Sequence, residues 1–127
     1  MSFPSGSCVY VVDDDASVRR ALARLLKSAG FVVESFASAE AFLSQMSPDR
    51  ASCIVLDVQL PGMNGVDLQQ VLKARQIHVP LVFITGHGDA DLERKLRAEG
   101  ACGYLQKPFE ESHLISSIRA AIAALDS

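Results

Sequence analysis

The carboxylate of Asp57 comes directly after a short apolar run, residues 53–56, and shortly before the turn residues of 60–65. An uninterrupted apolar run of this length, bounded by turn residues, is typical of a strand buried on both faces. In open α/β sheets, ligands bind beyond the carboxyl ends of the strands. Asp57 is therefore a candidate functional residue, although an aspartate at such a position is also a common helix cap.

Polar side chains also follow the other apolar runs of the sequence. If the strands are parallel, their carboxyl ends lie at one edge of a sheet, and these side chains converge there. The set consists of carboxylates, a hydroxyl and an ammonium: Asp13, Asp14 and Asp15 after residues 8–12, Asp57, Thr85 after residues 81–84, and Lys107 after Tyr104, Leu105 and Gln106.

Clustered carboxylates beside a lysine indicate a site for a hard divalent cation. Magnesium takes oxygen ligands, keeps several waters, and is commonly held by one or two carboxylates together with phosphate oxygens. With the cation bound, an ionised Asp57 can approach a phosphoryl group, and Lys107 and the Thr85 hydroxyl neutralise further charge. The pattern therefore favours Mg²⁺-dependent phosphoryl chemistry at Asp57, with Mn²⁺ as an acceptable substitute.

Two other sites of doubly wound proteins fit this sequence less well. A dinucleotide or flavin phosphate needs glycines or hydroxyls after the first strand, whereas the acidic run that starts at Asp13 would repel it. A phosphatase of the haloacid dehalogenase type has a second aspartate two positions after its nucleophile, where this sequence has Gln59. Simpler interpretations also remain for single residues: Asp13, Asp14 or Asp15 as helix caps, Lys107 as a solvated loop lysine, and Tyr104 as an ordinary half-buried aromatic.

The elements that must position these residues alternate along the chain. Five apolar runs are interleaved with five helical patterns, which predicts an α/β fold with a doubly wound parallel sheet. The partly polar run at 31–36 is typical of an edge strand. Helices are expected near residues 18–29, 38–46, 66–72, 90–99 and 110–125.

Two of these helices differ in how much apolar surface they can bury. The helix at 90–99 offers mainly Leu92 and Leu96 and is otherwise charged, so it is expected to be loosely held. The helix at 18–29 is strongly amphipathic, and its basic face, which includes Arg19, is either solvated or available to a partner.

Length and composition limit the class of protein. A chain of 127 residues fits one domain, and its net charge of −3 argues against nucleic-acid binding by this chain. No apolar run is long enough to span a membrane, and residues 1–6 lack the basic start and apolar core of a signal peptide. A cytoplasmic protein is expected.

The isolated cysteines and histidines do not suggest a zinc site. The three cysteines, Cys8, Cys53 and Cys102, are expected to be small buried residues. The three histidines, His78, His87 and His113, are expected to be neither metal ligands nor phosphohistidines.

Taken together, the motifs resemble the receiver domain of bacterial two-component response regulators over residues 7–125, after a tail at 1–6 that is expected to be disordered. The matching residues are Asp13-Asp14, Asp57 with the following turn, Thr85-Gly86 and Lys107-Pro108-Phe109. Each motif is weak alone, but their joint order and spacing are specific. Residues 84–89 and 38–43 are most similar to the FixJ-type branch of transcriptional regulators, which carries a helix-turn-helix output domain after a linker. The sequence is therefore expected to be a stand-alone receiver or the input half of such a regulator.

The resemblance implies a CheY-like fold with strand order 2-1-3-4-5, and a role for each site residue. Asp57 would accept a phosphoryl group from a histidine of a sensor kinase. Asp14 would ligate Mg²⁺ directly and Asp13 through water, with Asp57 and the backbone carbonyl of Gln59 as the remaining protein ligands. Lys107 would pair with the acyl phosphate and would precede a cis peptide bond to a proline.

The resemblance also implies a switch. Thr85 would move toward the phosphoryl group and Tyr104 would turn inward, so that the fourth helix, fifth strand and fifth helix carry the signal, with homodimerisation through this surface as one form of output. Gln59 and His87, each two residues beyond a site residue, are candidates for setting the lifetime of the phosphorylated state. The alternative function is a phosphorylation-independent docking module on the same fold, which would not need all the acidic, hydroxyl and ammonium groups.

Overall fold

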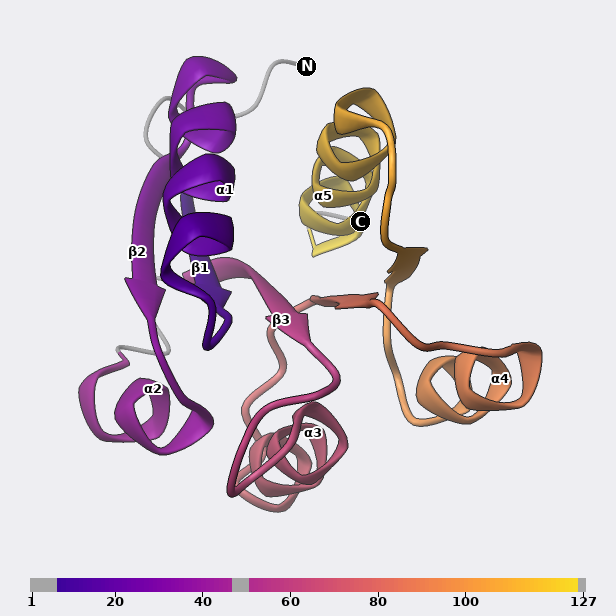
Figure 1. Cartoon of the computed structure of the whole chain (residues 1–127). Helices are drawn as coiled ribbons and strands as arrows, with labels where there is room; N and C mark the ends of the chain where they lie inside the picture. Colours follow the sequence, from indigo (N-terminus) through magenta and orange to yellow (C-terminus); the bar gives the residue numbers. More distant parts are fainter. Residues whose placement is uncertain (1–6, 47–50, 126–127) are drawn as a thin grey trace.

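The computed structural model describes residues 7–46 and 51–125, so the tail expected at 1–6 lies outside the described residues. Strands and helices alternate through these ranges (Figure 1). The strands are β1 (Cys8–Val12), β2 (Val32–Phe36), β3 (Ala51–Asp57), β4 (Leu81–Thr85) and β5 (Gly103–Gln106). The helices are α1 (Ala16–Ser28), α2 (Ala39–Gln45), α3 (Gly65–Ala74), α4 (Ala90–Ala98) and α5 (Glu111–Leu125).

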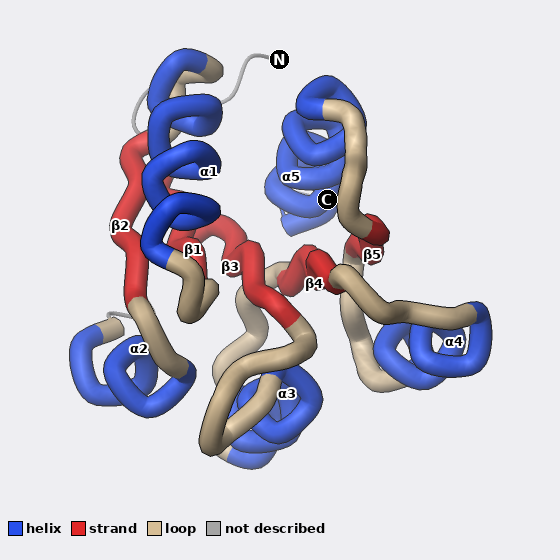
Figure 2. Tube along the Cα trace, viewed as in Figure 1, coloured by secondary structure: helices blue, strands red, loops and turns tan. Residues whose placement is uncertain are grey.

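The strands form one parallel sheet in the order β2-β1-β3-β4-β5, which confirms the predicted topology. Figure 2 shows α1 and α5 on one face of the sheet and α2, α3 and α4 on the other. Because all the strands run in the same direction, the residues that follow β1, β3, β4 and β5 lie at one edge of the sheet. This edge brings together the polar residues singled out in the sequence.

Side chains of successive strand residues point to opposite faces and build two separate hydrophobic layers. In β3, for example, Ile54 and Leu56 pack in the layer under α2, α3 and α4, whereas Cys53 and Val55 pack in the layer under α1 and α5. The central strands are therefore buried on both faces, as their continuous apolar sequences predict. The edge strands β2 and β5 are only partly buried, and Val32 of β2 keeps 44% of its surface exposed.

The helix starts settle which aspartate caps α1. The carboxylate of Asp15 accepts hydrogen bonds from the backbone N–H groups of Ser17 and Val18, so Asp15 is the N-cap. The hydrogen bond from Ser17 lowers the pKa of the Asp15 carboxyl. Asp13 and Asp14 are left for the site at the sheet edge, and the predicted cap of α2, Ser38, is confirmed.

The anchoring of α4 is richer than its sequence indicates. Leu96 is fully buried and Leu92 packs against the same core, as predicted. In addition, the buried side chain of Gln69 on α3 donates to the backbone carbonyl of Leu96 over 3.2 Å, and Lys73 of α3 pairs with Glu99. The carboxyl end of α4 is thus tied to α3, whereas its amino end continues from the loop after Thr85.

The expected burial of the cysteines is confirmed for Cys8 and Cys53 and is wrong for Cys102, whose side chain is exposed. Cys102 precedes β5, and the neighbouring Ala101 takes the buried position instead. In a short connection such as 99–102, the side chain that faces the core depends on the local backbone and not on strand or helix periodicity.

Candidate functional site

Asp57 ends the central strand β3 and is 6% exposed. One carboxylate oxygen, Oδ1, accepts a hydrogen bond from the backbone N–H of Gln59 over 2.8 Å. The other, Oδ2, accepts from the ammonium of Lys107 over 3.0 Å. The first residue of α3, Gly65, lies against the end of β3. A Cβ at this position would lie 2.7 Å from the backbone oxygen of Asp57, so the position requires glycine.

Asp13 follows β1 and is completely buried beside Asp57. Its Oδ1 accepts from the backbone N–H of Asp15 over 2.9 Å, and its Oδ2 lies 3.5 Å from the Lys107 ammonium. Burial raises the pKa of the Asp13 carboxyl; the hydrogen bond from Asp15 and the charge of Lys107 oppose this effect, and the charge of Asp57 adds to it. A buried carboxylate with a raised pKa is one whose negative charge is incompletely compensated.

Asp14 completes the acidic cluster from the exposed side. Asp13, Asp14 and Asp57 each offer a carboxylate oxygen, and these oxygens all lie within 4.8 Å of one another. The Lys107 ammonium pairs with two of these carboxylates, Asp13 and Asp57, and no ion pair neutralises Asp14 among the described residues. Oxygen ligands at this separation fit the preferences of Mg²⁺ or Mn²⁺, so the donor set suits a hard divalent cation.

Lys107 follows β5 and reaches into the cluster with a side chain that is 30% exposed. Burial alone would lower the pKa of this ammonium, but the hydrogen bond to Asp57 and the charge of Asp13 outweigh it and raise the pKa. The backbone N–H of Lys107 donates to the Thr85 carbonyl over 2.8 Å, and the bond to Pro108 is cis, as the resemblance implied. Lys107 is therefore a member of the site and not a solvated loop lysine.

Thr85 ends β4 with a buried side chain, and its hydroxyl is directed to Gln59. The hydroxyl donates to Oε1 of Gln59 over 3.3 Å and accepts from the backbone N–H of His87 over 3.1 Å. The amide nitrogen of Gln59 donates to the backbone carbonyl of His87 over 3.3 Å. Gln59 and His87 thus contact each other beside Thr85, but His87 contributes its backbone while its side chain is exposed.

Comparison with known proteins agrees with this geometry. The sequence profile of the response regulator receiver domain matches residues 9–119. The chain is 45% identical to nodulation protein W of Bradyrhizobium diazoefficiens, over 89% of this chain and 50% of that protein. It is 43% identical to the transcriptional regulatory protein FixJ of the same organism, over 90% of this chain and 56% of that protein.

The chain belongs to the response regulator receiver family.

Comparison with solved structures also finds response regulators. The response regulator StyR superposes with a TM-score of 0.87 at 45% identity, covering 92% of this chain and 59% of that one. The structure described as FixJ-N gives a TM-score of 0.85 at 38% identity, covering 94% of this chain and 96% of that one. The predicted similarity to the FixJ-type branch is confirmed. The receiver domain spans about half the length of the curated relatives it matches.

In this receiver domain, Tyr104 of β5 has its hydroxyl beneath the loop that follows β4. A Cβ placed on Gly88 would clash with the Tyr104 hydroxyl and would lie 2.6 Å from Cγ2 of Thr85. Burial raises the pKa of the Tyr104 hydroxyl, and the charges of Asp89 and Glu93 add to this effect. Tyr104 therefore lies next to Thr85 with its hydroxyl already buried, and Gly88 provides the space for it.

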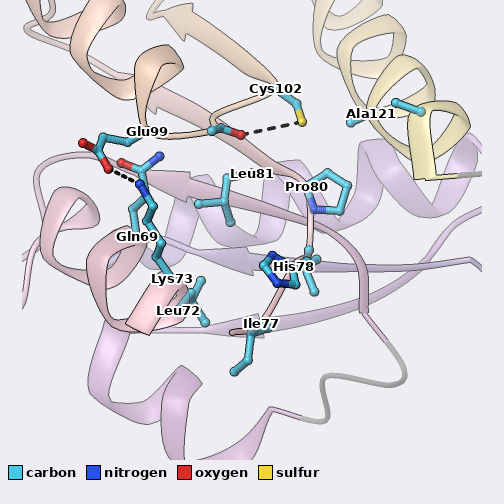
Figure 3. A pocket seen from close by; sticks show the side chains of 13 residues that line it. Gln69, Leu72, Lys73, Ile77, His78, Pro80, Leu81, Glu99, Cys102 and Ala121 are labelled. Carbon is cyan, nitrogen blue, oxygen red and sulfur yellow. Dashed lines mark hydrogen bonds and ion pairs between the residues drawn. The ribbon is translucent and has the colours of Figure 1, made fainter. Parts of the chain in front are cut away.

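A cavity of about 380 Å³ lies at the opposite end of the sheet from the acidic cluster. Its lining includes Leu81, the first residue of β4. Thr85, which lies at the acidic site, is the last residue of the same strand. Figure 3 shows Gln69, the ion pair between Lys73 and Glu99, and the Cys102 thiol around it. The site residues predicted from the sequence therefore lie at the acidic edge of the sheet and not around this cavity.

Sequence reasoning missed two contacts of the site. Arg19, assigned to a solvated or docking face of α1, donates from its guanidinium to the backbone carbonyl of Asp13 over 2.7 Å. The second missed contact is the pair of hydrogen bonds that joins the Gln59 side chain to Thr85 and His87. Spacing along the chain indicates neither contact, because each depends on the path of a long side chain between two loops.

Proposed function

We propose that Asp57 accepts a phosphoryl group from a histidine of a sensor kinase in a Mg²⁺-dependent reaction. The observation that carries this proposal is the contact of the Lys107 ammonium with Asp57, inside a cluster whose other carboxylates come from Asp13 and Asp14. A carboxylate oxygen of Asp57 forms a bond to phosphorus as the bond from phosphorus to the histidine nitrogen breaks. The electron pair of the broken bond returns to the imidazole.

The residues that would hold the cation are Asp14 directly, Asp13 through water, Asp57, and Gln59 through its backbone carbonyl. The bound cation would neutralise negative charge on the phosphoryl oxygens and so permit their approach to Asp57. Support comes from the mutual distances of the three carboxylates and from the raised pKa of Asp13, both of which indicate a demand for added positive charge. Mn²⁺ has similar oxygen preferences and would substitute.

Phosphorylation then acts through Thr85, Lys107 and Tyr104. A phosphoryl group adds roughly two negative charges and three acceptor oxygens, which attract the Thr85 hydroxyl and the Lys107 ammonium. Movement of Thr85 changes the space around Tyr104, and the surface formed by α4, β5 and α5 transmits the change to a partner or to a second copy of the chain. Gln59 and His87 set how long the phosphoryl group persists, which a Gln59→Ala, His87→Ala double variant tests through its dephosphorylation rate.

The output is control of transcription in a cytoplasmic two-component system, through a part of the regulator other than residues 7–125. The curated relatives of which this chain covers 56% include proteins named as transcriptional regulators. The chain carries a net charge of −3, which is unfavourable for contact with nucleic-acid phosphates. Within the described residues, no helix has the length and apolar character needed to cross a bilayer.

Incubation with acetyl phosphate and Mg²⁺, followed by intact-mass measurement, tests this function without a cognate kinase. The expected result is the mass of one added phosphoryl group on the wild-type chain and none on Asp57→Asn. An unchanged wild-type mass would instead indicate the phosphorylation-independent docking module.

A further inference from the structure

The side chain of Gln59 links the loop after β3 to the loop after β4. Its amide oxygen accepts from the Thr85 hydroxyl and its amide nitrogen donates to the His87 carbonyl, each over 3.3 Å. The backbone of Gln59 is fixed independently, because its N–H donates to Asp57 over 2.8 Å. The bridge therefore starts from a residue held in place by the phosphoacceptor and ends on the loop that leads into α4.

The bridge occupies the one proton that the Thr85 hydroxyl can donate. The same hydroxyl already accepts from the His87 N–H over 3.1 Å, so Thr85, Gln59 and His87 form a closed set of hydrogen bonds. A phosphoryl group on Asp57 that is to receive a hydrogen bond from Thr85 must take this proton from Gln59. Gln59 and the phosphoryl group therefore compete for one donor.

We propose that the Gln59 side chain is a latch that holds Thr85 and the loop at 85–88 in the unphosphorylated arrangement. This inference rests on the proposed function of Asp57 and assigns Gln59 a positioning role. The latch opposes the switch in every molecule that is not phosphorylated, and so lowers the fraction that is active without a signal. Gln59 is exposed, so water competes for its hydrogen bonds and the latch is weak enough to be opened.

The role differs from control of the phosphoryl lifetime. A lifetime effect acts on the attack of water on the acyl phosphate, whereas a latch acts on the equilibrium between two arrangements of Thr85. A probe that binds Asp57 without being hydrolysed separates the two effects. Beryllium fluoride with Mg²⁺ is such a probe, because it adds to a carboxylate and presents fluorines where phosphoryl oxygens would lie.

The test compares beryllium fluoride affinity in Gln59→Met, which keeps the length of the side chain but removes both hydrogen bonds, with wild type. Loss of two neutral hydrogen bonds, one of them exposed and the other partly buried, is expected to tighten binding by roughly 3- to 10-fold. Gln45→Met, at the exposed end of α2, is the matched control and should bind as wild type does. Gln59→Ala should give the same direction of change.

A double-variant cycle shows whether the effect passes through Thr85. In a Thr85→Val background, which keeps the shape of the side chain but removes the hydroxyl, Gln59→Met should change affinity by much less than it does alone. In the metal-free chain, the His87 amide resonance of Gln59→Met should shift toward its position in the beryllium fluoride complex of the wild type. An affinity equal to or weaker than wild type, or an unmoved His87 resonance, would overturn the latch.

Failure of the latch is distinguishable from failure of the proposed function. If wild type binds beryllium fluoride and Asp57→Asn does not, but Gln59→Met matches wild type, the latch is wrong while the phosphoacceptor role stands. If wild type takes up neither beryllium fluoride nor a phosphoryl group from acetyl phosphate, the proposed function fails and the latch fails with it.

Discussion

The ammonium nitrogen of Lys107 lies 3.0 Å from Oδ2 of Asp57, although 50 positions separate the two residues in the sequence. The same nitrogen lies 3.5 Å from Oδ2 of Asp13. Lys107 thus joins two buried carboxylates that would otherwise repel each other. The Lys107 ammonium lies where both a cation and a phosphoryl group would bind. Its positive charge should therefore oppose binding of the cation and favour binding of the phosphoryl group.

Replacement of Lys107 by methionine should therefore strengthen Mg²⁺ binding in the absence of phosphate. The ammonium repels the cation and occupies two of the carboxylates that the cation needs, and its removal is expected to tighten binding roughly threefold or more. Calorimetric titration with MgCl₂ measures this, with the exposed Lys27→Met on α1 as the control. Weaker binding by Lys107→Met than by the control would show that the ammonium supports the cation site.

Replacement of Asp13 by asparagine should stabilise the metal-free fold at neutral pH. Burial raises the pKa of Asp13, so the folded state binds this proton more tightly than the unfolded state, and ionisation of the group costs stability. As the pH rises, this loss of stability begins near the ordinary pKa of 3.8 and reaches its full size above the raised pKa. Asp13→Asn should raise the melting temperature by roughly 3 °C or more at pH 7. The gain should fade as the pH falls through the raised pKa toward 3.8.

Thermal unfolding across this pH range, with and without Mg²⁺, provides the measurement. Asp91→Asn, which removes an exposed carboxylate on α4, is the control and should show no comparable gain. Added Mg²⁺ should raise the melting temperature of wild type more than that of Asp13→Asn. A pH-independent gain would indicate that the raised pKa of Asp13 is not its cause.

Gly88→Ala should force Tyr104 out of its place under the loop after β4. The added Cβ would clash with the Tyr104 hydroxyl, whereas a Cβ at Gly86 would meet no described atom within 4 Å, so Gly86→Ala is a matched control. The expected cost for Gly88→Ala is about 1–3 kcal/mol of unfolding free energy, the usual range for overpacking. Tyrosine fluorescence and denaturant unfolding report both effects, since the chain has no tryptophan.

The cost of Gly88→Ala should fall in a Tyr104→Ala background, because the clash with the tyrosine is then absent and only the contact with Cγ2 of Thr85 remains. Equal costs in both backgrounds would mean that the strain arises from Thr85 or from the backbone of the loop and not from Tyr104.

The fold was largely predictable because the strands carry continuous apolar runs and the helices carry a clear 3.6-residue period. The site residues were predictable for a related reason: parallel strands present their carboxyl ends at one edge, so Asp13, Asp57 and Lys107 had to converge. The exposed Cys102 and the buried Gln69 were not predictable. Cys102 lies in a loop without periodicity, and Gln69 is buried because its amide reaches the carbonyl of Leu96 on another helix.

Truncation of the apolar anchors of α4 should change the switch more than truncation elsewhere in the core. Leu92→Ala and Leu96→Ala weaken α4, the helix proposed to move, whereas Leu22→Ala removes a buried side chain from α1 on the opposite face of the sheet. A fully buried leucine costs about 2–5 kcal/mol when truncated, so the overall loss for Leu96→Ala and Leu22→Ala should be similar. Beryllium fluoride-linked dimerisation, measured by sedimentation, should differ from wild type for the α4 variants only. An equal effect of Leu22→Ala would count against α4 as the moving element.

The central claim is that a divalent cation, held by Asp13 and Asp14, makes Asp57 the phosphoryl acceptor. Its most direct test is to react the chain with acetyl phosphate in Mg²⁺ and in excess chelator, and to locate the modified residue by fragmentation of the peptide that contains Asp57. The account predicts one phosphoryl group on Asp57 in Mg²⁺ and none in chelator. Modification of a different residue, or equal modification of Asp57 without the cation, would contradict it.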